Sequence, residues 1–111
     1  NKMALPLNVF QTITHIAPAS LVGIYTAPVG YSGVVLSCQA TNVDTTTHTV
    51  TLHHVRDTTE TEIVKQMPIQ GHDSMTLTQG KLVLESGDSL KLSASNANHV
   101  KFIASILETL N

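Results

Sequence analysis

The chain has 111 residues, of which 13% are charged and 41% hydrophobic, and its formal net charge is −2 at pH 7. This length suits one hydrophobic core and therefore one domain. The six basic residues are scattered and the apolar stretches are short, so the sequence predicts neither a nucleic-acid partner nor a membrane partner.

The charged fraction is about half of that usual in globular proteins. A weakly charged surface favours a domain that packs against other protein, and a merely threonine-rich surface is the alternative. Threonine occurs fifteen times. Threonine, valine and isoleucine are β-branched and suit the pleated surface of a sheet, so the composition favours strands.

The first half of the chain predicts extended segments that are separated by proline and glycine turns. Strands are expected at residues 9–16, 21–26, 33–42 and 48–55. The strand at 33–42 alternates in polarity, which predicts Val34, Leu36, Cys38 and Ala40 on the core side. In the strand at 48–55, Val50 and Leu52 are expected to face inward.

The second half predicts a hairpin and several short strands. Strands are expected at residues 62–67, 75–78, 81–85, 89–95 and 99–107. A polar loop at 56–61 precedes the first of these, and Pro68 is expected to end it because proline cannot donate to a ladder. Residues 106–110 could form a helical turn, which is too short to be stable alone.

About nine short strands at turn spacings of roughly eight to twelve residues are typical of a sandwich or barrel. No segment has a sustained helical period. The sequence therefore predicts an all-β, two-sheet antiparallel β-sandwich, immunoglobulin-like or jelly-roll, at residues 8–111. An N-terminal arm, residues 1–7, precedes it.

No pattern of catalytic or cofactor-binding residues stands out. Carboxylate pairs occur at Glu60 with Glu62 and at Asp57 with Glu60, in a threonine-rich loop that reads as solvated. There is no G-x-S-x-G elbow, and the six glycines stand singly, so no phosphate-cradling loop is expected. The sequence predicts a protein that is not an enzyme and needs no cofactor.

Six histidines are the candidate metal ligands, and spacing argues against them. His53 and His54 are adjacent on a predicted strand, so their side chains point to opposite faces. His48 and His54 share a face but lie about 20 Å apart along an extended strand. A site would need His15, His72 or His99 brought in through the fold, and no metal site is predicted. Cys38 is the single cysteine and is expected to be a small core residue.

Two stretches carry a resemblance to a known family, residues 24–55 and 81–108. Their landmarks are Tyr25, Pro28, Gly30, Asn42, Gly87, Asp88, Ser93, Ser95 and Glu108. This order of turns and strands resembles small structural proteins of tailed bacteriophages and covers about two-thirds of the chain. The resemblance implies a β-sandwich in the virion, on the head surface or in the neck and tail, and it brings no catalytic residues.

The functional hypothesis is a capsid decoration (cement) protein, located in the virion, whose partner is the major capsid protein or another virion protein. A homo-oligomer, with a trimer favoured, would bind a lattice by avidity. The alternatives are a neck, tail or baseplate component and a carbohydrate-binding module, although four aromatic residues offer little for sugar stacking. The candidate subunit-interface residues lie in the arm and are Met3, Leu5, Pro6 and Leu7. The arm could instead cover the sandwich itself.

Overall fold

Nine β-strands and no helix make up residues 7–111, the part of the chain that this computed structural model describes. The strands are β1 (Asn8–Ile16), β2 (Val22–Thr26), β3 (Tyr31–Asn42), β4 (His48–Arg56), β5 (Thr59–Ile69), β6 (Ser74–Thr76), β7 (Leu82–Leu84), β8 (Ser89–Ala94) and β9 (Val100–Leu110). The predicted all-β class is confirmed.

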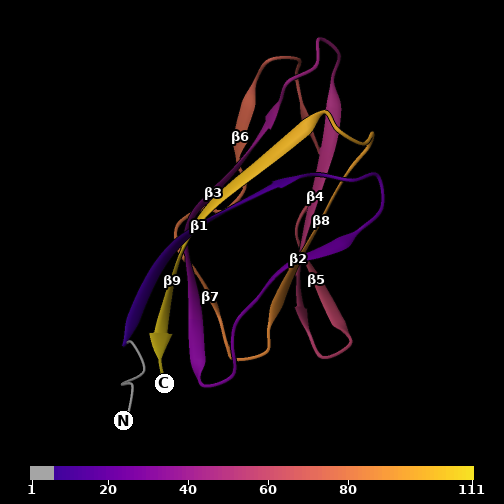
Figure 1. Ribbon diagram of the computed structural model, residues 1–111. Coiled ribbons are helices and arrows are strands. Elements are labelled where there is room, and N and C mark those ends of the chain that lie inside the picture. The colour runs from indigo at the N-terminus through magenta and orange to yellow at the C-terminus, as the bar shows by residue number, and fades with distance from the viewer. Residues whose placement is uncertain (1–6) are drawn as a thin grey trace.

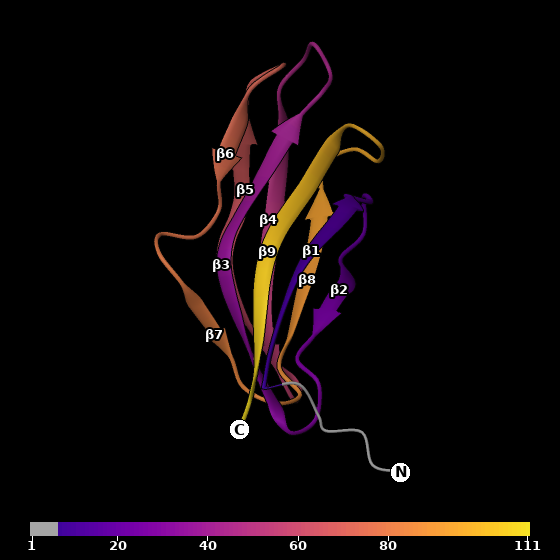
Figure 2. The same cartoon turned by 60° about the vertical axis from the view of Figure 1, so that its left-hand side comes forward.

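The strands form two antiparallel sheets that pack face to face (Figures 1 and 2). The five-stranded sheet has the order β1-β9-β3-β6, with β7 also paired to β3, and the four-stranded sheet has the order β2-β8-β4-β5. The first four strands show why this is a jelly roll, because they alternate between the sheets: β1 and β3 lie in one sheet, and β2 and β4 in the other. An immunoglobulin sandwich keeps its first two strands in the same sheet, so the topology selects the jelly-roll alternative.

Apolar side chains that alternate along the strands fill the space between the sheets. Leu52 on β4 and Leu92 on β8 are fully buried and face Phe102 and Ile106, which come from β9 in the other sheet and are also buried. The predicted inward positions of Val50 and Leu52 in β4 are confirmed, since both are fully buried. Because consecutive side chains of a strand point to opposite faces, the other positions form the outer surfaces of the two sheets.

The predicted alternation of β3 is wrong in its first half. Val35, Cys38 and Ala40 are buried, whereas Val34 and Leu36 are only half-buried and lie outside the core cluster. The register of β3 against β9 shifts between Val35 and Ser37. Such a bulge inserts one residue and reverses which side chains face inward, so Cys38 and Ala40 follow the predicted phase and Val34 and Leu36 do not.

The hairpin between β4 and β5 is longer than predicted, and its loop is shorter. Arg56 pairs with Thr59, so only two residues form the turn, and Asp57 there has a φ of 54°. A positive φ in a two-residue turn matches the twist of the flanking strands. Pro68 does not end β5 but pairs with Thr49, because β5 is the edge strand and needs no donor on its open side. β9 likewise continues to Leu110 without a helical turn.

Candidate functional site

The outer face of the five-stranded sheet carries an apolar row across four strands. In the register, Phe10 on β1 lies beside Leu107 on β9, Leu107 beside Val34 on β3, and Val34 beside Val83 on β7. Side chains in register share a face of the sheet, so these four residues form a continuous row. Phe10 is 72% exposed and Val83 55% exposed. The row therefore presents apolar surface that the folded domain leaves uncovered.

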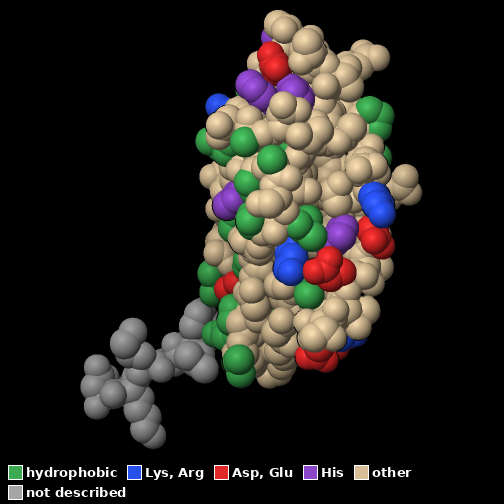
Figure 3. All heavy atoms as spheres, turned by 90° about the vertical axis from the view of Figure 1, so that its right-hand side faces the viewer, with side chains coloured by type: hydrophobic (Ala, Val, Ile, Leu, Met, Phe, Trp, Pro, Cys, Tyr) green, Lys and Arg blue, Asp and Glu red, His purple; other side chains and the backbone are tan. Residues whose placement is uncertain are grey.

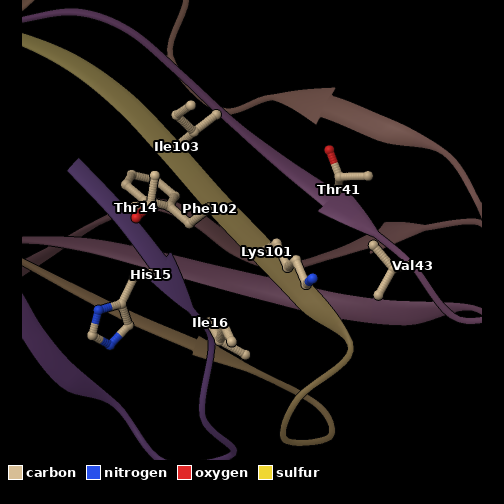
Figure 4. A pocket seen from close by; sticks show the side chains of 8 residues that line it. All are labelled: Thr14, His15, Ile16, Thr41, Val43, Lys101, Phe102 and Ile103. Carbon is tan, nitrogen blue, oxygen red and sulfur yellow. The ribbon is translucent and has the colours of Figure 1, made fainter. Parts of the chain in front are cut away.

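Toward the end of the sheet at which β1 finishes, the same face becomes a shallow hollow. Its volume is about 710 Å³, and its side chains come from β1, β9 and the end of β3 (Figure 4). It is lined by Thr14, His15, Ile16, Thr41, Val43, Lys101, Phe102 and Ile103. Ile16, Val43 and Ile103 are exposed there, and Lys101 is the single charged side chain that lines it. We call the apolar row and this hollow together the outer face.

The opposite surface, on the four-stranded sheet, has a different character. Lys91 Nζ lies 3.1 Å from Glu60 Oε2, and His53 Nδ1 lies 2.9 Å from Glu60 Oε1. These contacts, the His53 hydrogen bond first, hold the pKa of Glu60 below its usual value. Figure 3, in which this side faces the viewer, shows basic side chains next to acidic ones. Paired, hydrated charges of this kind are typical of a surface that stays in water.

The contrast between the two surfaces points to the outer face as a protein contact. The centres of protein interfaces are depleted in charged residues, and large exposed apolar patches mark interaction sites. The sequence predicted Val34 on the core side, and it did not mark Phe10 or Val83 as contact residues. The available signal was that β1 has apolar residues on both of its faces, with Phe10 and Ile16 opposite Val9 and Ile13.

Asp88, a landmark of the phage resemblance, has a structural role within the fold. Its buried carboxylate accepts hydrogen bonds from Arg56 Nε (2.9 Å), Arg56 Nη2 (2.7 Å) and the backbone N–H of Glu85 (2.9 Å), and it lies 3.1 Å from His54 Nε2. The hydrogen bonds from Arg56 are the main reason that the pKa of Asp88 lies well below its usual range. The carboxylate thus fastens the turn before β8 to β4.

Glu108 and Tyr25, two further landmarks, join the two sheets. Glu108 Oε2 accepts hydrogen bonds from Tyr25 Oη (2.5 Å) and from Gln11 Nε2 (2.6 Å). Burial and the nearby Glu108 carboxylate raise the pKa of Tyr25 above its usual value. A Cβ at Gly33 would lie 2.9 Å from Tyr25 Oη, so a larger residue at this position would collide with the tyrosine side chain.

Asn42 is fully buried at the end of β3 and fixes the loop that follows. Its Nδ2 donates to the carbonyls of Thr46 and Ile69, both at 2.8 Å, and its Oδ1 accepts from the N–H of Asp44 at 2.9 Å. Four of the landmarks therefore stabilise the fold through hydrogen bonds within the domain: Asn42, Asp88, Tyr25 and Glu108.

Among residues 7–111, one group of possible metal ligands does come together, at the end of the sandwich that holds the β3–β4 loop and the β8–β9 turn. Asp44, His48 and His99 each offer a ligand atom, and these atoms lie within 4.8 Å of one another. His48 and His99 lie far apart in the sequence and are brought together by the fold, so spacing along one strand does not predict this grouping. His53 and His54 have separate contacts, with Glu60 and Asp88.

Of the predicted interface residues, Met3, Leu5 and Pro6 lie outside the described residues. Leu7 is exposed, and its carbonyl accepts a hydrogen bond from the N–H of Leu110 at 2.8 Å. The described residues contain no helix that is long and apolar enough to cross a membrane.

No family model matches the chain, and no curated protein matches it in sequence. The solved structures that share its fold include the following two. A chain of the acidic stable capsid structure of Helicobacter pylori bacteriophage KHP30 is 14% identical over 95% of this chain and 89% of that one, with a TM-score of 0.58. A chain from Bacillus endospore appendages, described as a novel family of disulfide-linked pili, is 17% identical over 100% of this chain and 99% of that one, with a TM-score of 0.54. At these identities the likeness shows a common fold.

Proposed function

We propose that this protein is a non-enzymatic structural component of a tailed-bacteriophage particle, specifically a capsid decoration protein. It binds the major capsid lattice through the outer face of the five-stranded sheet. The observation that carries the proposal is the apolar row of Phe10, Leu107, Val34 and Val83, which lies on a face with almost no charge. The resemblance of the turn landmarks and the shared fold with a phage capsid chain support the particle type.

The proposed mode of attachment combines weak contacts from several copies. We propose a closed, three-fold oligomer in which residues 1–7 contact a neighbouring copy. A trimer that meets a lattice of matching spacing sums the contacts of its three protomers, so each outer face can bind weakly. Its contact with the shell would bury the exposed Phe10 and Val83 side chains.

Three other functions are compatible with some of the same observations. A neck, tail or baseplate component would use the same face on a different partner. A disulfide-linked filament is disfavoured by Cys38, the single cysteine of this sequence, which is buried with its Sγ 3.7 Å from Thr78 Oγ1. A carbohydrate-binding module is disfavoured because, among the phenylalanines and tyrosines of residues 7–111, Phe10 alone is exposed.

Phe10→Asp should weaken binding to purified phage heads by at least about tenfold, since it places a charge where the proposed contact buries an aromatic side chain. The matched control is Val29→Asp, which places the same charge on a 93% exposed apolar residue in the β2–β3 turn. This control should bind as the unmodified chain does. The measurement is co-sedimentation of folded protein with heads and, separately, with tails.

Each outcome of this experiment has one meaning. Binding to heads that Phe10→Asp reduces and Val29→Asp preserves supports the proposal. Binding to tails alone makes the protein a tail component. Equal loss in both variants contradicts the outer face as the contact, and no binding to either particle contradicts the virion role.

A further inference from the structure

The side chains of Asp44, His48 and His99 converge although 51 residues separate the two histidines. His48 Nε2 lies 2.9 Å from Asp44 Oδ2, and His99 Nδ1 lies 3.8 Å from the same oxygen. The two imidazole rings stack with their centroids 4.9 Å apart and an angle of 9° between their planes. Two imidazole nitrogens therefore lie close to one carboxylate oxygen.

The backbone holds this arrangement in place before any ligand arrives. The N–H of Val43 donates to the carbonyl of His99 at 2.9 Å, which ties the β3–β4 loop to the β8–β9 turn. The Asp44 carbonyl accepts from the N–H of His72 at 3.0 Å, and Asp44 Oδ1 accepts from the N–H of Thr45 at 2.7 Å. Preorganised ligands lose little conformational entropy when an ion binds.

The donor set matches a borderline divalent ion. Imidazole nitrogen and carboxylate oxygen are ligands of Zn²⁺ at about 2.0–2.2 Å, which places tetrahedral ligand atoms roughly 3.3 Å apart. The observed distances from Asp44 Oδ2 to His48 Nε2 (2.9 Å) and to His99 Nδ1 (3.8 Å) lie on either side of that value. The His99 side chain is 42% exposed, so its ring can rotate to close the longer gap.

A second contact orients the buried histidine in the way that metal sites require. His48 Nδ1 lies 3.4 Å from Ser95 Oγ, and this oxygen is itself held by the N–H of Thr49 at 2.9 Å. At 2.9 Å from the Asp44 carboxylate oxygen, His48 Nε2 donates a hydrogen bond to it, and a bound ion would replace that proton while Nδ1 keeps its contact with Ser95 Oγ. When each imidazole gives one nitrogen lone pair to the ion, the three ligands together carry one negative charge, which favours a dication.

We propose that Asp44, His48 and His99 form a binding site for a divalent transition-metal ion of the Zn²⁺ class. Three protein ligands leave a fourth position, which is open to water or to a group from a partner because Asp44 and His99 are partly exposed. The site fastens the β3–β4 loop to the β8–β9 turn at one end of the jelly roll. The inference does not depend on the proposed virion role.

Zinc should raise the melting temperature of the untagged, full-length chain by about 5 °C or more at a concentration a hundredfold above the dissociation constant. Titration calorimetry should give one Zn²⁺ per chain, and bound Co²⁺ should develop visible absorption. An untagged chain is required because a polyhistidine tag binds the same ions.

Variants separate this site from casual binding by other histidines. His99→Ala and Asp44→Asn should weaken zinc binding by at least about tenfold, whereas His15→Ala, outside the cluster, should leave it unchanged. His99 is partly exposed, so its variant decides the matter even if Asp44→Asn disturbs the loop. Absence of a zinc-induced shift, or an equal shift in His99→Ala, would overturn the proposal and leave the cluster as a hydrogen-bonded cap of the loop.

Discussion

Phe102→Ala should lower the free energy of unfolding by about 3–5 kcal/mol, the cost of a large cavity in a packed core. Phe102 is 2% exposed between the two sheets. Phe10→Ala, in the neighbouring strand β1 but on the outer face, should cost less than about 1 kcal/mol because that ring is mostly in solvent. Urea unfolding followed by circular dichroism measures both values.

This pair of variants also tests what the exposed phenylalanine is for. A ring that contributes little to folding, yet lies in an apolar row, is available for a partner. If Phe10→Ala proves as costly as Phe102→Ala, the assignment of inner and outer faces in the five-stranded sheet is wrong, and with it the proposed contact.

Asp88→Asn should lower the free energy of unfolding by about 3 kcal/mol, because it removes a buried charge that Arg56 contacts with two nitrogens. Asp57→Asn, in the exposed turn after β4, is the matched control and should change little, since asparagine tolerates the positive φ there. Thermal and urea unfolding at neutral pH measure both variants.

The same carboxylate gives the expected pH dependence. The pKa of Asp88 is lowered in the folded protein, so its contribution to stability is complete above the unfolded value of about 3.9 and is lost as the pH falls toward the folded value. The unmodified chain should therefore lose more stability than Asp88→Asn when the pH is lowered below about 4. Equal losses in the two proteins would show that Asp88 is not the group responsible.

The strands could be predicted from the sequence because their apolar and polar residues alternate, as in β4, β8 and β9. The alternation failed at Leu36, where a bulge in β3 changes the phase and nothing in the local sequence marks it. The prediction that Pro68 ends its strand was also wrong, because the sequence does not say which strand lies at the edge of a sheet. The jelly-roll topology depends on pairings such as β1 with β9, which no local pattern specifies.

The candidate sites were harder to predict, since both arise from contacts between distant segments. The local sequence does not distinguish Phe10 and Val83 from other strand residues. The register of the sheet places them in one row across β1, β9, β3 and β7. His48 and His99 meet because two connections of the jelly roll end on the same side. The landmarks Asn42 and Asp88 were visible in the sequence, but their role in holding loops needed the hydrogen bonds.

The virion role can be tested by electron microscopy of purified particles of the phage that encodes this protein. We expect jelly-roll density on the outside of the head, in three-fold clusters. The five-stranded sheet should lie against the shell with Phe10 and Val83 buried, and the charged four-stranded sheet should face solvent. Absence of the protein from purified particles, or attachment through the four-stranded sheet, would contradict the proposal.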